Sequence, residues 1–201
     1  MMKTTALLAL IGSAAAFAPL QTKSASSALA DKPFSDVPGV AGPVGYWDPC
    51  KLIADGDQEN FDHFRESEIK HGRIAMLAVV GYLTTAAGVR FPGAEGMPDG
   101  LKAFPALTES PEGLNVLGQM LLFVVLAERC NRNVTGEAEF PGDYRNGALD
   151  FGWDSFDDAT KYKKRTIEIN NGRAAMMGIW GLVTHELLGN SILPGGYLPG
   201  H

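Results

Sequence analysis

The sequence predicts an all-α membrane protein with three transmembrane helices, of which the first and third form a crossed pair related by a pseudo-twofold axis. Two observations support this prediction. Three uncharged, mostly apolar runs lie between residues 60 and 188, and the segment 68–81 recurs 100 residues later as 168–181, with seven of fourteen positions identical. A helix that occurs twice with the same charges is typical of two helices that pack as symmetry mates.

Each uncharged run is shorter than a membrane crossing requires. Residues 74–89, 113–127 and 174–185 comprise 16, 15 and 12 residues, whereas a spanning helix needs about 20. The helices can therefore span only if flanking ionisable residues enter the membrane in paired form. With their turn residues, the runs predict helices over about 60–88, 112–132 and 156–188. The alternative is three buried helices of a soluble bundle.

Turn residues separate these helices. Arg90-Phe91-Pro92 stops the first helix, and a loop rich in glycine and proline follows to about Pro111, where Pro111-Glu112 opens the second helix. A Trp-Asp turn precedes both the first helix, at Trp47, and the third, at Trp153. Ser155 with Asp158 three residues later predicts a capping box for the third helix.

The duplicated charges predict contacts between the first and third helices. Glu68 and Arg73 are five residues apart, which places them about 140° apart around one helix, so they pair poorly within it. If the two copies cross as symmetry mates, Glu68 meets Arg173 and Glu168 meets Arg73. Pairing matters because an unpaired charge at membrane depth costs roughly 2.5–3.5 kcal/mol. Small residues suit a close crossing: Gly72, Ala75, Gly172 and Ala175.

The N-terminus resembles a targeting segment. Residues 1–16 have the charged, apolar and small-residue regions of a signal peptide, residues 17–30 resemble a plastid transit segment, and 31–201 form the expected mature domain. Seven Lys/Arg residues lie between 129 and 165, two in the loop 89–112 and none in 186–201, which predicts the N-terminus on the positive side and the C-terminus opposite. Net charge is −6, or −8 without residues 1–30, which argues against nucleic-acid binding.

Several side chains in the helices can hold a metal ion. His71 and Asn171 follow Glu68 and Glu168 by three residues, and carboxylate, imidazole and amide oxygen are all donors for a divalent ion with a vacant axial position. A Glu-x-x-His pair is also half of a di-metal motif, but the second copy has Asn instead of His and the other half is missing. Separate single-ligand sites fit better. The two cysteines, Cys50 and Cys130, are too few for a disulfide framework.

The duplicated Glu-x-x-[His/Asn]-Gly-Arg-x-Ala-Met motif, together with Arg145-Asn-Gly and Asp150-Phe-Gly-Trp-Asp-Ser155, resembles the chlorophyll a/b-binding superfamily and its fucoxanthin chlorophyll a/c branch. The similarity covers about residues 40–190. It implies the following chlorophyll ligands: Glu68, His71, Glu168, Asn171, His185, Gln119 and Glu128. It also implies charge partners: Arg73, Arg173 and, for Glu128, Arg132. Gln119 lies one residue further from Glu128 than in green-plant relatives, and His185 has the alternative of an interfacial histidine.

The resemblance implies a light-harvesting antenna and no enzyme. The implied cofactors are chlorophyll a, chlorophyll c and fucoxanthin, with a xanthophyll-cycle carotenoid as a further candidate. The implied location is the plastid thylakoid membrane, with a stromal N-terminus and lumenal C-terminus, and the implied partners are other antenna subunits, in an oligomer, and a photosystem core. One alternative is a photoprotective member that senses acid through loop carboxylates: Glu95, Asp99, Glu109 and Glu112. Another is a small membrane enzyme or proton carrier, for which the sequence offers no nucleophile–base pair, phosphate loop or shared metal cluster.

Overall fold

The computed structural model describes residues 34–53, 56–136, 138–146 and 150–190, and these ranges contain helices and loops but no strand. The elements in chain order are α2 (Gln58–Ala86), η2 (Gly100–Lys102), α3 (Ala103–Glu109), α4 (Pro111–Cys130), η3 (Trp153–Ser155) and α5 (Asp158–Leu187). The three long helices begin and end within two residues of the expected ranges. The expected signal peptide and transit segment lie outside the described residues.

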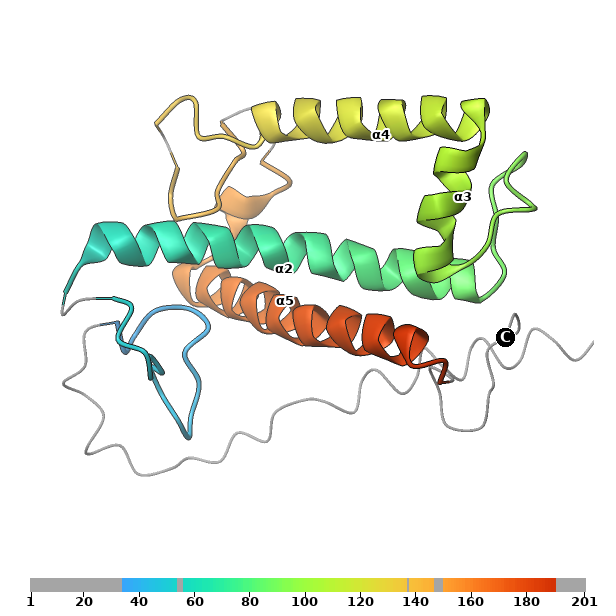
Figure 1. Cartoon of the computed structure of the whole chain (residues 1–201). Helices are drawn as coiled ribbons and strands as arrows, with labels where there is room; N and C mark the ends of the chain where they lie inside the picture. Colours follow the sequence, from blue (N-terminus) through green and yellow to red (C-terminus); the bar gives the residue numbers. More distant parts are fainter. Residues whose placement is uncertain (1–33, 54–55, 137, 147–149, 191–201) are drawn as a thin grey trace, which may run out of the picture.

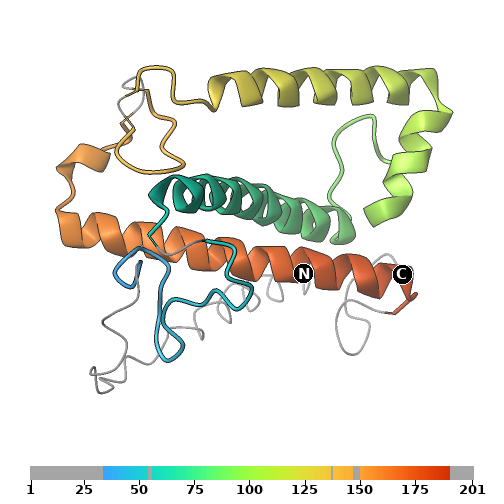
Figure 2. The same cartoon turned by 60° about the vertical axis from the view of Figure 1, so that its left-hand side comes forward.

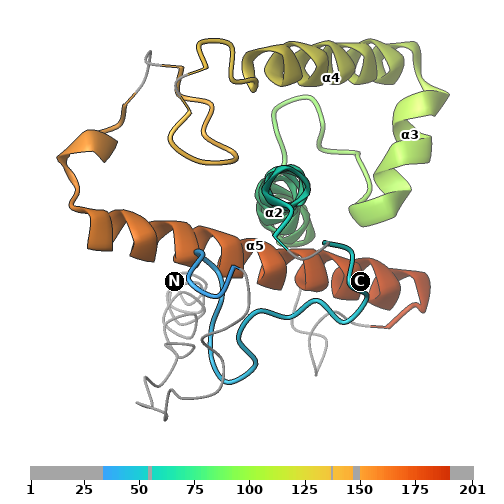
Figure 3. The same cartoon turned by 90° about the vertical axis from the view of Figure 1, so that its left-hand side faces the viewer.

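Helices α2 and α5 pack directly against each other and cross (Figure 1, Figure 3). At the crossing, a Cβ added to Gly72 would lie 3.0 Å from the Cα of Gly172, and the reverse is equally close. Both positions therefore need glycine, because backbone atoms cannot move aside as a side chain can. Ile69, Ala75 and Ile169 are buried next to the crossing.

Helix α4 stands apart from this pair in every view (Figure 2). Its start is well defined: Ser110 Oγ accepts a hydrogen bond from the Gly113 amide at 3.0 Å, and Pro111 occupies the first turn, where its missing N–H costs nothing. Its apolar side chains are mostly exposed, as Phe123 is at 72%. By length and apolar composition, α4 is the one helix among the described residues that qualifies as a candidate membrane span.

Two sequence expectations about local structure were wrong. The segment expected to be a loop up to Pro111 contains η2 and α3. The proline in this segment does not prevent a helix, because Pro105 lies in the first turn of α3, where proline is tolerated. The predicted capping box is absent: α5 follows Asp157, and Ser155 Oγ instead donates to the Gly152 carbonyl at 2.6 Å. Ser155 belongs to η3, whose own turn uses its hydroxyl.

Glu186, near the end of α5, joins three elements. Its Oε2 accepts a hydrogen bond from Tyr82 Oη of α2 at 2.7 Å, and its Oε1 accepts one from the Leu101 amide of η2 at 2.8 Å. Arg90, just after α2, pairs with Asp99 and donates to the Thr85 carbonyl. These contacts connect α3, and through it α4, to the crossed pair.

Candidate functional site

The two expected ion pairs between α2 and α5 are both present, and this prediction is confirmed. Arg73 Nε donates to Glu168 Oε1 at 2.7 Å, and Arg173 Nε donates to Glu68 Oε1 at the same distance. Each carboxylate therefore receives its partner from the opposite helix, across the glycine contact. All four side chains are partly exposed rather than buried, so their outer faces remain accessible to a ligand.

Each of these arginines also binds a loop. Arg173 Nη1 donates to the Gly39 carbonyl at 2.6 Å, and Arg73 Nη1 donates to the Gly142 carbonyl at 3.0 Å. Both glycines have φ near +90°, and a Cβ there would lie 2.8 and 3.0 Å from the side chains of Ile169 and Ile69. Sequence reasoning missed these two loops. The Pro-Gly dipeptides at 38–39 and 141–142 were the signal that could have found them.

The two carboxylates differ in one respect. Arg65 Nη1 donates to Glu68 Oε2 at 2.7 Å, so both oxygens of Glu68 accept hydrogen bonds from guanidinium groups. Arg165, which holds the same place in the second copy, lies with its Cζ 4.1 Å from the ring centroid of Phe140. Glu168 Oε2 receives no hydrogen bond from the described residues.

His71 is oriented as a metal ligand would be. Its Nδ1 lies 2.7 Å from the Ser67 carbonyl oxygen, and its side chain is exposed. Because a carbonyl only accepts, Nδ1 carries the proton, which leaves the Nε2 lone pair free to bind a metal. Asn171, at the same place in α5, is also exposed. Neither residue contributes to the ion pairs of the crossing.

The remaining ligand candidates lie away from the crossing. Gln119 and Glu128 are exposed on α4, and His185 is exposed in the last turn of α5. Glu128 Oε2 lies 3.7 Å from Lys70 Nζ of α2. The expected ion pair with Arg132 is not formed, because α4 ends at Cys130 and Arg132 therefore does not lie one helical turn beyond Glu128. Within the described ranges, no three His, Cys, Asp or Glu side chains converge on one ion site.

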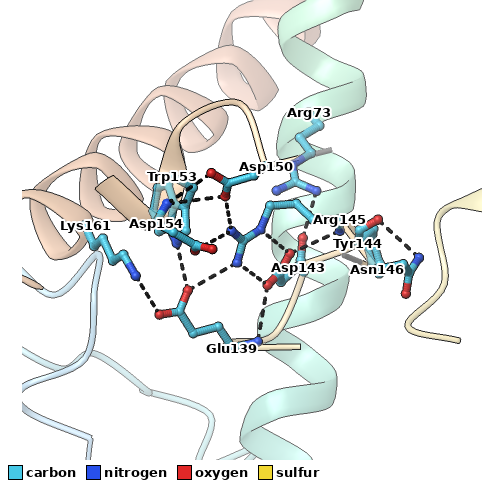
Figure 4. Close-up of polar contacts among 11 residues, drawn as sticks. Arg73, Glu139, Asp143, Tyr144, Arg145, Asn146, Asp150, Trp153, Asp154 and Lys161 are labelled. Atoms are coloured by element: carbon cyan, nitrogen blue, oxygen red, sulfur yellow. Dashed lines mark hydrogen bonds and ion pairs between the residues drawn. The ribbon is translucent and has the colours of Figure 1, made fainter. Parts of the chain in front are cut away.

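A charged network fixes the loop between α4 and α5 (Figure 4). Arg145 is its centre and pairs with four carboxylates: Glu139, Asp143, Asp150 and Asp154. Its hydrogen bonds to Asp143 lower the pKa of that nearly buried carboxyl to about 2. Glu139 further accepts from Trp153 Nε1 at 2.7 Å and from Lys161 Nζ at 2.9 Å, and these two bonds lower its pKa.

This network holds the Gly142 carbonyl in place for Arg73. The Asp143 amide closes a turn onto the Phe140 carbonyl, and the Asp143 carboxylate accepts from the amides of Glu139 and Arg145. Tyr144 Oη donates to Glu66 Oε1 of α2 at 2.6 Å. The loop is thus tied to α2 on both sides of Asp143, and Arg73 is oriented toward Glu168.

Comparison with known proteins gives concordant matches. The family model described as chlorophyll A-B binding protein matches residues 33–187. The fucoxanthin-chlorophyll a-c binding protein C of Phaeodactylum tricornutum is 52% identical, covering 96% of this chain and all of the relative. A fucoxanthin-chlorophyll a-c binding protein of Trieres chinensis is 48% identical, over 95% of this chain and 97% of the relative. Protein E of Macrocystis pyrifera is 41% identical, over 86% and 84%.

Proposed function

The chain belongs to the chlorophyll A-B binding protein family, and we propose that it is a light-harvesting antenna subunit that binds chlorophyll a, chlorophyll c and fucoxanthin. The names of its chloroplastic relatives support this pigment set. The bound pigments would absorb light and transfer the excitation to one another and to a photosystem. The protein would set their spacing and orientation and would make or break no covalent bond.

The observation that carries the proposal is the reciprocal pairing of Glu68 and Glu168 with arginines of the opposite helix. Chlorophyll magnesium has four ring nitrogens and needs one axial donor. A carboxylate can serve as that donor inside a membrane only if its charge is compensated, and the arginine of the opposite helix compensates each glutamate. Both glutamate side chains remain partly exposed. His71 and Asn171 would hold two more chlorophylls, and His71 has its Nε2 lone pair free.

The helix lengths support three membrane crossings. At 1.5 Å per residue, α4 with 20 residues is about 30 Å long, the thickness of a bilayer core. Helices α2 and α5, with 29 and 30 residues, are about 44 Å long, so they would span with a tilt. The arginines that precede their apolar runs, Arg73 and Arg173, are the ones paired at the crossing.

The subunit would lie in the thylakoid membrane with its N-terminus stromal and its C-terminus lumenal. The loop between α4 and α5, with its lysines and arginines, would then face the stroma, and α3 the lumen. Other antenna subunits in an oligomer and a photosystem core would receive the excitation. Gln119, Glu128 and His185 would hold further pigments, because each is exposed on a spanning helix.

Pigment reconstitution tests this function. The chain, refolded with chlorophyll a, chlorophyll c and fucoxanthin, should give a coloured complex, and His71→Leu and Asn171→Leu should each lose one chlorophyll per protein. His63→Leu is the matched control, since His63 is an exposed histidine on the same helix and should change nothing. A colourless complex would contradict the proposed function, and an unchanged chlorophyll content in both ligand variants would make these positions structural.

A further inference from the structure

The duplicated glutamates are not equivalent in their surroundings. Glu68 accepts hydrogen bonds from two guanidinium groups, Arg173 at Oε1 and Arg65 at Oε2, both at 2.7 Å. Glu168 accepts one, from Arg73 at Oε1. The hydrogen-bonded unit around Glu68 therefore has a formal charge of +1, whereas the unit around Glu168 is neutral. The sequence conceals this difference, because arginine stands three residues before the glutamate in both copies.

The two arginines lie over different aromatic rings. Phe140 precedes the Pro-Gly turn of the second loop, and the guanidinium of Arg165 lies over its ring, 4.1 Å from the centroid. At this distance a cation is attracted to the ring face. The corresponding residue before the first Pro-Gly turn is Val37, which has no ring. Arg65 lies instead over Phe61 of its own helix, 5.1 Å from the centroid, and from there it still donates to Glu68. Val37, Phe140, Arg65 and Arg165 line one cavity of about 510 Å³, so both arginines face the same space.

The arrangement affects how strongly each carboxylate binds magnesium. An oxygen that accepts a charge-assisted hydrogen bond gives up part of its electron density to the donor, which makes it a weaker ligand. Glu168 keeps one oxygen that no described residue contacts, while Glu68 has none. We propose, on the basis of the function proposed above, that Arg65 sets the duplicated pigment sites apart: it makes Glu68 the weaker magnesium ligand and places a positive charge beside the chlorophyll bound there.

The positive charge of Arg65 also affects the absorption wavelength of the chlorophyll bound at Glu68. A fixed charge beside a chlorophyll changes the energy of its excited state relative to its ground state, so the two duplicated sites absorb at different wavelengths. Arg65 thus affects the site energy through its positive charge as well as through the glutamate. The duplicated helix then supplies two chlorophylls of different energy from one motif.

Reconstituted wild-type complex and four variants test this inference. Difference absorption spectra at low temperature against Glu68→Leu and Glu168→Leu identify the band of each chlorophyll, and dilution into detergent gives its rate of loss. In wild type the Glu68 chlorophyll should be lost about fivefold faster than the Glu168 chlorophyll. This ratio corresponds to about 1 kcal/mol, the net free energy of one hydrogen bond. Arg65→Leu should abolish this difference and shift the Glu68 band, whereas the matched variant Arg165→Leu should leave the loss rate at Glu168 unchanged.

The reverse change gives a second test. Phe140→Val removes the ring, so Arg165 should turn to Glu168 Oε2, accelerate chlorophyll loss there about fivefold and shift the band toward that of the Glu68 site. Adding Arg165→Leu to Phe140→Val should cancel both effects. If Phe140→Val acted only by disrupting the loop, the second substitution would not restore the wild-type loss rate and band. Circular dichroism monitors folding of each variant. Equal loss rates and equal bands at the two sites of wild type would overturn the inference while leaving the proposed function intact, and a wild type without pigment would refute both.

Discussion

At the scale of single residues, Glu68 and Glu168 hold the crossed helices together, because each receives a hydrogen bond from the opposite helix. Their arginines also reach a loop carbonyl, at Gly39 or Gly142. One guanidinium thus joins two helices and a loop in each half of the molecule. Loss of an arginine should therefore affect more than the contact it makes with its glutamate.

Arg73→Leu should destabilise the protein more than Arg173→Leu. The first change leaves Glu168 without a guanidinium, which costs about 2.5–3.5 kcal/mol at membrane depth, whereas Glu68 keeps Arg65 after the second change. Thermal loss of helix circular dichroism in detergent, with Lys163→Leu on the exposed face of α5 as control, should rank the variants in this order. Equal destabilisation would show that the bond from Arg65 contributes nothing to Glu68.

At the scale of elements, the loop between α4 and α5 is organised by charge rather than by an apolar core. Arg145 contacts four carboxylates within this loop and the start of the following 3-10 turn. The carboxyl most affected is that of Asp143, whose pKa is lowered from 3.8 to about 2. A carboxyl with a depressed pKa in the folded state stabilises the fold above its unfolded pKa and loses this contribution as pH falls.

We expect acid to release this loop between about pH 4 and pH 2. Above pH 4 the Asp143 contribution is complete, on the order of 2 kcal/mol for this shift, and it disappears as the carboxyl protonates. Trp153 donates to Glu139 of the same network, so its fluorescence reports the change once Trp47 and Trp180 are replaced by Phe. Asp143→Asn should flatten the transition, and a full transition in that variant would assign it to other carboxyls.

The Glu186 contacts should determine how α3 is held. Glu186→Ala removes acceptors for Tyr82 and Leu101 together, so α3 should sample a wider range of positions. Spin labels at Thr108 and Met177, both exposed, would give a broader distance distribution than in wild type. Glu109→Ala alters an exposed carboxylate on α3 itself and should leave the distribution unchanged. An equally narrow distribution in Glu186→Ala would mean that other contacts position α3.

At the scale of the whole molecule, α4 is the long helix least supported by protein contacts. Its main packing partner is α3, and leucine, valine and phenylalanine side chains along it are more than half exposed, as at Leu121, Phe123 and Val125. Within a membrane, lipid and pigment would cover these side chains. The position of α4 relative to the crossed pair would then depend on these groups as well as on the contacts made through α3.

Pigment should accordingly protect α4 more than it protects the crossing. Amide hydrogen exchange of the chain in detergent can be measured with and without pigment. Pigment should slow the exchange most over 111–130 and least around Gly72 and Gly172, which pack on each other directly. A complex refolded with carotenoid alone separates the contribution of chlorophyll. Uniform protection across all helices would contradict the view that α4 relies on pigment for its packing.

The duplication made the central features predictable. A repeat that carries Glu and Arg five residues apart requires contacts between copies, so both ion pairs and the glycine contact followed from the sequence. The predicted pairing of Arg132 with Glu128 was wrong because the prediction assumed that the helix continues past Cys130, where α4 ends. The different contacts of Arg65 and Arg165 could not be predicted, because Val37 and Phe140, which precede the two distant Pro-Gly turns, are brought near these arginines only by tertiary packing.

The contact between Gly72 and Gly172 also limits how the molecule can move. The backbones have no room to approach further there, and the two ion pairs oppose separation. The remaining motion of α2 against α5 is rotation about this point, which the hydrogen bond from Tyr82 to Glu186 restrains at one end. Rotation changes distances little near the pivot and much at the helix ends. Transfer between pigments depends steeply on distance, so chlorophylls at Glu68 and Glu168, four residues from the pivot, would keep a constant coupling. One at His185, thirteen residues away, would keep its coupling only while the hydrogen bond from Tyr82 to Glu186 holds the helix ends together.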